Sequence, residues 1–208
     1  MPNDNLELGA VFQPDWDSRP VRVLAFDTQQ VMYDAWFAHE SRWGINSLNQ
    51  RISYFRLPTS LLLDRSRYLR TDEYSELERA IHRPDLPFSF GANATLDWPT
   101  ICPGTVTDFP GSTKDASVHV ESQSLELLAP QIYLSPFGPK GGPKPSTLIT
   151  AENGRCFMID EILWQAARLQ SSHLRNDKVT QGVGIYRSGI QKTLPSFYIW
   201  GAKSRMDI

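Results

Sequence analysis

Cysteine is scarce in this sequence, and no long apolar run is present. The 208 residues contain two cysteines, Cys102 and Cys156, too few for a disulfide framework or for a zinc site built from cysteines alone. No apolar run reaches the roughly 18 residues that a transmembrane helix needs. The first residues also lack the basic start and the apolar stretch of a secretory signal. We therefore expect a reduced, cytoplasmic protein without membrane contact.

Several motifs that identify enzymes and nucleotide-binding proteins are also missing. The loop over 137–145 carries Lys140 and Lys144 beside a Gly-Gly pair, but Lys144 stands between two prolines, which the phosphate-cradling motif does not allow. The Gly-x-Gly pair at 182–184 lacks the third glycine of a dinucleotide-binding loop. No Gly-x-Ser-x-Gly sequence is present. We expect no cofactor, and the absence of these motifs favours a protein that is not an enzyme.

The composition is that of a globular protein, but the charge is unevenly divided. Hydrophobic residues make up 40% and charged residues 21%, which excludes wholesale disorder. From Ser135 to the end there are ten Lys or Arg against five Asp or Glu, while the rest of the chain is acidic. Such asymmetry is typical of a surface for nucleic acid or an acidic partner. It is equally consistent with two halves that dock through complementary charge.

The N-terminal third of the chain is rich in predicted strands. Apolar residues alternate over Val21–Phe26, and Val31–Phe37 follows after a short polar turn, which predicts a hairpin. Another strand is expected to open at Ile52 and to be limited by Pro58. Several short strands within about 55 residues indicate a small barrel or half-barrel. This part is similar in outline to an SH3-like small barrel.

The remainder of the chain predicts two helices and a C-terminal hairpin. One helix is expected over Thr71–Arg83 with Thr71 as its cap, and a stronger one over Phe157–Gln170. Two strands are expected from Gly182 to Ile190 and from Ser196 to Ala202. A helix followed by a hairpin is possible in a winged-helix module and equally at one edge of an α/β sandwich.

We therefore predict an α+β protein in three parts. These are a β-rich subdomain over 1–70, a helix with a proline-rich connector over 71–117, and a basic α/β portion over 118–208.

The basic C-terminal portion is the strongest functional signal. Lys and Arg attract phosphates, and aromatic faces stack on unpaired bases, so their interleaving predicts a surface for single-stranded nucleic acid or RNA. The predicted function is non-enzymatic binding of DNA or RNA. The predicted contact residues are Arg175, Lys178, Arg187, Lys192, Lys203, Arg205, Tyr186, Tyr198 and Trp200.

A structural explanation of the same segment stands beside the functional one. Val183, Ile185, Phe197 and Ile199 occupy alternate positions of the two predicted strands, so they would face a core. The charged residues would then form only a solvated face.

Two further functions remain open. The acidic, tryptophan-rich N-terminal half, with Trp16, Trp36 and Trp43, suits a protein–protein adaptor or inhibitor, because aromatics anchor interfaces. A metal-dependent nuclease or hydrolase would use Asp27, Asp34, His39 and Glu40, since carboxylates and histidine hold divalent metals. Their spacing is not diagnostic, so we predict no metal site.

His173 offers another route to RNA cleavage. It would act as a general base, with Lys178 or Tyr186 assisting.

Overall fold

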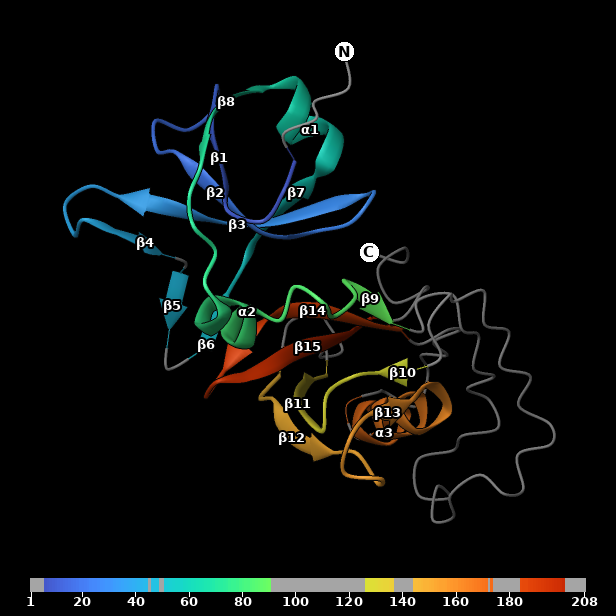
Figure 1. The fold of residues 1–208 in the computed structure, drawn as a ribbon. Coiled ribbons are helices and arrows are strands. Elements are labelled where there is room, and N and C mark those ends of the chain that lie inside the picture. The colour runs from blue at the N-terminus through green and yellow to red at the C-terminus, as the bar shows by residue number, and fades with distance from the viewer. Residues whose placement is uncertain are drawn as a thin grey trace. The chain divides into compact units, whose positions relative to one another are not determined.

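The computed structural model describes residues 6–44, 46–48, 51–90, 126–136, 144–171, 173 and 184–200. Over these ranges the fold is mixed α and β with mostly strands and few helices, which confirms the predicted α+β class (Figure 1). The chain divides into two compact units. Unit 1 comprises residues 1–88 and 189–193, and unit 2 comprises residues 89–188 and 194–208.

The unit boundaries differ in position from the three predicted parts. Unit 1 extends past residue 70 to Phe88 and includes the helix that we assigned to a connector. Residues 91–117, most of the predicted connector, lie outside the described residues. The division at residues 70 and 117 therefore stays a prediction.

Unit 1 is built on an antiparallel sheet with the strand order β4-β3-β2-β1-β8. Its strands are β1 (Ala10–Pro14), β2 (Val21–Phe26), β3 (Gln30–Phe37), β4 (Arg42–Gly44) and β8 (Ser66–Thr71). The first half of β3 also pairs with β7 (Phe55–Pro58), and α1 (Thr59–Asp64) connects β7 to β8. Within the described ranges β7 and β8 form no ladder with each other, and no closed barrel is found.

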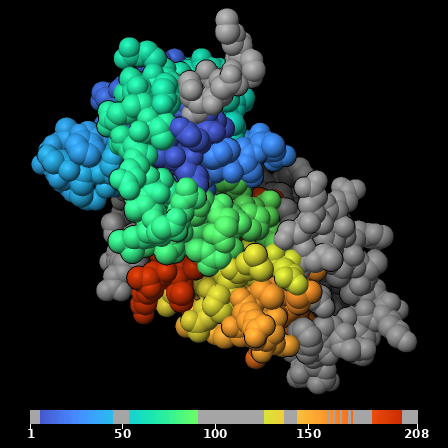
Figure 2. All heavy atoms as spheres, in the orientation of Figure 1, coloured from blue at the N-terminus to red at the C-terminus, as the bar shows by residue number. Residues whose placement is uncertain are grey.

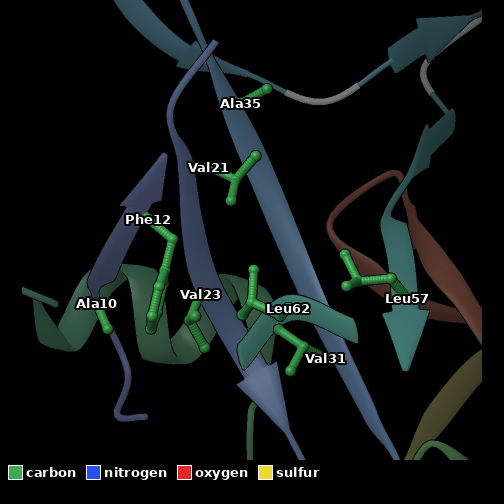
Figure 3. Close-up of a cluster of buried hydrophobic side chains, with 8 residues drawn as sticks. All are labelled: Ala10, Phe12, Val21, Val23, Val31, Ala35, Leu57 and Leu62. Atoms are coloured by element: carbon green, nitrogen blue, oxygen red, sulfur yellow. The ribbon is translucent and has the colours of Figure 1, made fainter. Parts of the chain in front are cut away.

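One buried cluster of unit 1 gathers side chains from four strands and α1. Figure 3 shows these side chains pointing into the space between β1, β2, β3, β7 and α1. Phe12 is fully buried and meets the ring of Tyr68 on β8 edge to face, with 5.7 Å between the centroids. Burying one such side chain contributes about 1.5–3 kcal/mol. The cluster consists of Ala10, Phe12, Val21, Val23, Val31, Ala35, Leu57 and Leu62.

A second cluster of unit 1 lies on the other side of β2. Val21 and Val23 face the first cluster, whereas Leu24 and Ala25 belong to the second. The register between β2 and β3 shifts between Val23 and Ala25, which marks a bulge and changes the alternation of side chains. Strand β2 is therefore buried on both sides. The second cluster consists of Leu24, Ala25, Met32, Tyr54, Phe88 and Ile190.

Helix α2 (Glu76–His82) begins later than the sequence predicts. Ser75 is its N-cap, and its Oγ accepts a hydrogen bond from the Glu78 amide. The Glu78 carboxylate accepts in return from the Ser75 amide, which completes a capping box. Thr71, the predicted cap, instead pairs in β8 with Ala10 of β1. The predicted start was wrong because a ladder to a distant strand fixes Thr71.

The remaining strands of unit 1 are short. β5 (Asn46–Leu48) pairs with β6 (Arg51–Ser53). β6 also pairs with Gly189–Gln191, the last three residues of β14 (Gly184–Gln191). Strand β14 therefore begins in unit 2 and ends in unit 1.

Unit 2 contains the strand order β12-β11-β15-β14. β11 pairs antiparallel with β12 and parallel with β15. β9 (Ser89–Phe90) pairs with β14, and β10 (Glu126–Leu127) pairs with β13 (Phe157–Met158). The four main strands are β11 (Gln131–Ser135), β12 (Thr147–Thr150), β14 (Gly184–Gln191) and β15 (Leu194–Trp200).

Helix α3 (Ile159–Ser171) confirms the stronger helix prediction. Ile162 and Ala166 are fully buried, as the apolar spacing predicts. Glu161 in the first turn is also buried. Its carboxylate accepts hydrogen bonds from the amides of Glu152 at 2.8 Å and Met158 at 3.4 Å, so it ties the preceding loop to the helix. No helix in the described part of the chain is long and apolar enough to cross a membrane.

Candidate nucleic-acid interface

The central feature of the predicted interface is a pair of stacked tyrosines in unit 2. Tyr186 on β14 and Tyr198 on β15 have ring centroids 5.6 Å apart and planes inclined by 21°. Both side chains are half-buried. Ser188 and Ser196, two positions along each strand, share a hydrogen bond of 2.7 Å between their hydroxyls. Because side chains alternate between the faces of a strand, these four residues lie on one face of the hairpin.

The opposite face of the hairpin is buried. Ile185, Phe197 and Ile199 have exposed fractions of 2% or less, as their alternate spacing predicts. Arg187 lies at the same parity as Ile185 and is also fully buried, with 0% exposure. This differs from the exposed row in which we expected it, and it excludes a phosphate contact by Arg187 in this conformation. Because side chains alternate between the two faces of β14, the position of Arg187 two residues after Ile185 predicts that both lie on the buried face.

Burial raises the pKa of the Tyr186 phenol above its ordinary value, and the neighbouring Tyr198 raises it further. The Tyr186 hydroxyl therefore stays protonated at neutral pH and can donate a hydrogen bond. The stacked pair adds an apolar, uncharged area to the hairpin. Such an area suits the face of a nucleobase better than the charge of a phosphate.

Lys192 lies at the turn between the two strands and belongs to unit 1. Lys192 and Thr193 both have positive φ angles, of 46° and 69°, as a two-residue hairpin turn with primed geometry requires. The turn leaves the Lys192 side chain exposed. It is the predicted contact residue that the structure shows as an exposed cation.

The other predicted contact residues are not placed by the structure. The side chain of Trp200, at the end of β15, lies outside the described side chains. Four predicted cations fall outside the described residues altogether, namely Arg175, Lys178, Lys203 and Arg205. Their contribution to the interface stays a prediction.

Many arginines of unit 1 lie against carboxylates of the same unit. Arg19 binds Asp17 at 2.7 Å, and Arg83 binds Asp85 at the same distance. The pKa of Asp17 is lowered by its hydrogen bond from Arg19. Local pairing of this kind reduces the attraction of a surface for phosphate. Further pairs join Arg65 to Asp15, Arg70 to Asp72 and Arg42 to Glu40.

The residues of the metal-site alternative have other roles in unit 1. Asp27 accepts hydrogen bonds from the amides of Gln29 and Gln30 and so shapes the turn before β3. His39 is exposed and pairs with Glu40 at 2.9 Å. Within the described ranges no three His, Cys, Asp or Glu side chains are grouped so as to hold a metal ion. His173 follows α3, and its proposed partner Lys178 lies outside the described residues.

Asp34, another residue of that alternative, belongs to a buried ion network. Arg22 donates to both Asp34 carboxylate oxygens, at 2.8 and 3.3 Å, and to Glu78 on α2 at 2.8 Å. The Arg22 guanidinium carbon also lies 5.0 Å from the centroid of the Trp43 ring. Burial raises the pKa of Asp34 to about 6, although its hydrogen bonds from Arg22 oppose that rise.

The tryptophans of the adaptor alternative lie on unit 1. Trp36 and Trp43 meet edge to face across the β3–β4 hairpin, with 5.4 Å between centroids. This hairpin forms a blue lobe at the left of Figure 2. Trp16 is 39% exposed, and the Arg65 guanidinium carbon lies 5.8 Å from its ring centroid. Aromatic and arginine side chains of this kind are enriched in protein interfaces.

Comparisons of this chain with protein-family models, with curated proteins and with solved structures give no match. The candidate interface therefore rests on its own geometry.

Proposed function

We propose that this protein binds single-stranded DNA or RNA without catalysing a reaction, and that Tyr186 and Tyr198 form the platform on which bases stack. The observation that carries the proposal is the stacked, half-buried tyrosine pair on one face of the β14–β15 hairpin. Stacking of one base on an aromatic side chain contributes about 1–3 kcal/mol and tolerates any base, because every base has a flat face.

Binding of a strand also requires cations that contact the backbone phosphates. Lys192 is exposed at the turn between the two strands. Arg175, Lys178, Lys203 and Arg205 flank the strands in the sequence and complete the proposed phosphate contacts. Arg187 takes no part in them, because it is fully buried. In the proposal Tyr186, Tyr198 and Trp200 stack, and the exposed cations hold the strand.

The proposal includes a finer description of each unit. The antiparallel order of β8, β1, β2 and β3, with β7 on β3, supports an SH3-like small barrel for unit 1. The succession of α3 and the β14–β15 hairpin supports a winged-helix-like arrangement in unit 2. A solution structure of the full chain tests both assignments.

Fluorescence anisotropy tests the function directly. Labelled single-stranded DNA, duplex DNA and RNA are titrated with the full chain over a series of salt concentrations. We expect single strands to bind more tightly than the duplex, and affinity to fall with salt by a slope that counts the phosphate contacts. Absence of binding to any of the three at low salt would refute the proposal.

Matched variants of the tyrosines separate stacking from charge. Tyr198→Ala removes an aromatic face and is expected to weaken binding of single strands by about tenfold, the effect of one lost stack. Tyr198→Phe keeps the ring and is expected to bind within about twofold of the wild type. The salt slope should be the same in all three proteins, because no cation is removed. Equal affinity of the Ala and Phe variants would contradict the stacking role.

A second candidate function is favoured by the exposed Trp16 and by the half-buried Trp36 and Trp43 of unit 1. An adaptor that binds a partner protein would use Trp16, Trp36 and Trp43 as anchors. A partner that co-purifies with the chain and withstands both nuclease and high salt would favour this function. Loss of that partner in Trp16→Ala, with a normal melting temperature, would assign the contact.

A further inference from the structure

Two carboxylates of unit 1 share the guanidinium group of Arg22. Arg22 donates two hydrogen bonds to Asp34 on β3 and one, of 2.8 Å, to Glu78 on α2. The two carboxylates differ in their contact with water, because the Asp34 side chain is 4% exposed and the Glu78 side chain is 25% exposed. When both carboxyl groups are ionised, two negative charges therefore face one positive charge.

Helix α2 is held against unit 1 by polar contacts more than by burial. All seven of its residues are exposed or half-buried, and Leu77 is 70% exposed. Its contacts include the bond from Arg22 to Glu78 and a hydrogen bond of 3.1 Å between Nδ1 of His82 and the Tyr54 hydroxyl. An element that buries little apolar surface opens at a lower free energy than the core does. Helix α2 can therefore detach while the sheet of unit 1 stays folded.

Asp34 faces groups from each element that packs against it. β2 contributes Arg22 and α2 contributes Glu78. Arg56 on β7 pairs with the residue two positions before Asp34 and so lies on the same face of the sheet. Trp43 on β4 is uncharged, and its ring centroid lies 5.0 Å from the Arg22 guanidinium carbon. Arg22 is thus the cation that bonds to Asp34, and Glu78 is the anion that competes for it.

The two carboxyl groups titrate in different pH ranges. Burial raises the pKa of Asp34 to about 6, Arg22 opposes that rise, and the charge of Glu78 adds to it. Partial burial alone would raise the pKa of Glu78, but its hydrogen bonds with Ser75 and its attraction to Arg22 lower it. Glu78 therefore stays ionised while Asp34 titrates, so repulsion between the two carboxylates begins when Asp34 loses its proton.

We infer that the Asp34–Arg22–Glu78 network is a pH-sensitive switch that holds α2 on the sheet of unit 1 when Asp34 is protonated and loosens α2 when Asp34 is ionised. With Asp34 neutral, Arg22 and Glu78 form a simple ion pair. Ionised Asp34 competes for the guanidinium group and repels Glu78. Glu78 is the partner that leaves, because water reaches it more easily than it reaches Asp34. This inference concerns unit 1 and does not depend on the proposed binding of nucleic acid.

Hydrogen exchange of single amides, followed by NMR on the full chain from about pH 5 to about pH 8, tests the switch. The amides of Arg79 and Arg83 report on α2, and those of Gly9 and Trp36 report on the sheet. We expect the α2 amides to be less protected than the sheet amides, which identifies local opening. After correction for the intrinsic exchange rate, protection of the α2 amides should fall about fivefold to tenfold as the pH rises over this range.

Variants assign the pH dependence to the network. Asp34→Asn cannot ionise, so its α2 amides should keep their protection at high pH. Glu78→Gln still completes the capping box and removes the charge that Asp34 repels, so it should also abolish the fall. Glu76→Gln is the matched control on the same helix, where the Glu76 side chain is 97% exposed, and it should behave like the wild type. Asp34→Asn retains His82, so any pH dependence left in that variant is assigned to His82.

Several outcomes would overturn the inference. A fall of equal size in the wild type and in Asp34→Asn would exclude Asp34 as its cause, and protection of α2 that rises with pH would have the wrong sign. Amides of α2 that exchange only together with those of the sheet would show that opening is global. The melting temperature identifies a variant that fails to fold. If Asp34→Asn is such a variant, Glu78→Gln decides, and a fall as large as in the wild type would contradict the switch.

Discussion

Arg22 connects three elements of unit 1 through one guanidinium group. It lies on β2, binds Asp34 on β3 with two hydrogen bonds, and reaches Glu78 on α2 with a third. Arg22 and Asp34 are 7% and 3% exposed, so both charges have lost most of their water. Pairing offsets that loss in part, and removal of one partner from such a network typically costs about 3–5 kcal/mol.

Asp34 gives unit 1 a pH dependence whose sign follows from its pKa. Burial raises that pKa to about 6 in the folded protein, against 3.8 as the ordinary value. Between these two pH values the Asp34 carboxyl keeps its proton in the folded state, whereas the unfolded chain has released it. The contribution of Asp34 to the free energy of unfolding is therefore complete below about pH 4 and is lost as the pH rises through about 6.

Asp34→Asn isolates this contribution, because asparagine keeps the shape and does not titrate. From about pH 4 to about pH 7 we expect the wild type to lose about 3 kcal/mol of unfolding free energy relative to the variant. Urea unfolding at a series of pH values measures both proteins. Stability curves that run parallel over this range would show that Asp34 does not titrate there.

At the scale of elements, the start of α2 depends on one side chain. Ser75 and Glu78 satisfy each other's backbone amides, while Glu78 also binds Arg22. The helix has seven residues, too few to be stable on its own. The Ser75 cap and the bond between Glu78 and Arg22 therefore hold it in place.

Ser75→Ala removes the hydroxyl that caps α2. We expect the free energy of unfolding to fall by about 1 kcal/mol, the usual effect of a lost N-cap. Ser75→Asp, which keeps an acceptor at the same position, should retain most of the stability. Urea unfolding of the two variants and the wild type makes the comparison. A Ser75→Ala variant as stable as the wild type would mean that the Glu78–Arg22 bridge alone fixes the helix.

Local patterns in the sequence predict several elements correctly. The β2–β3 hairpin and α3 both appear where alternation and helical spacing place them. The same reasoning fails at Thr71, because Thr71 pairs with the distant residue Ala10 in the ladder between β8 and β1 and so belongs to a strand. A helix cap and an edge strand look alike in sequence when their partners lie some 60 residues apart.

The candidate interface was predictable only in part. Alternation along the strand places Tyr186 and Ser188 on one face and Arg187 on the other, buried face. The burial of Arg187 could therefore have been predicted from the sequence. The stacking of Tyr186 on Tyr198 was not, because it depends on the register across the hairpin. We expected one strand to end at Ile190 and the next to begin at Ser196. The turn is Lys192-Thr193, with positive φ at two residues that rarely adopt it.

At the scale of the whole molecule, the proposed base-stacking platform is assigned to unit 2. The tyrosine platform lies on β14 and β15. Several arginines of unit 1 pair with carboxylates of the same unit. The excess of Lys and Arg over 135–208 does not make unit 2 basic as a whole, because residues 89–134 of the same unit are acidic and bring it to ten residues of each sign. The proposed anionic ligand is therefore assigned to the segment 135–208 and not to a whole unit.

The central claim is that bases contact Tyr186 and Tyr198, and crosslinking tests it most directly. The full chain is irradiated with a bromouridine-substituted single-stranded RNA, and the crosslinked peptides are identified by mass spectrometry. We predict crosslinks to Tyr186 or Tyr198, at a yield that Tyr198→Ala reduces and Tyr198→Phe preserves. Efficient crosslinking confined to residues outside β14 and β15 would contradict the account, because the bases would then stack elsewhere.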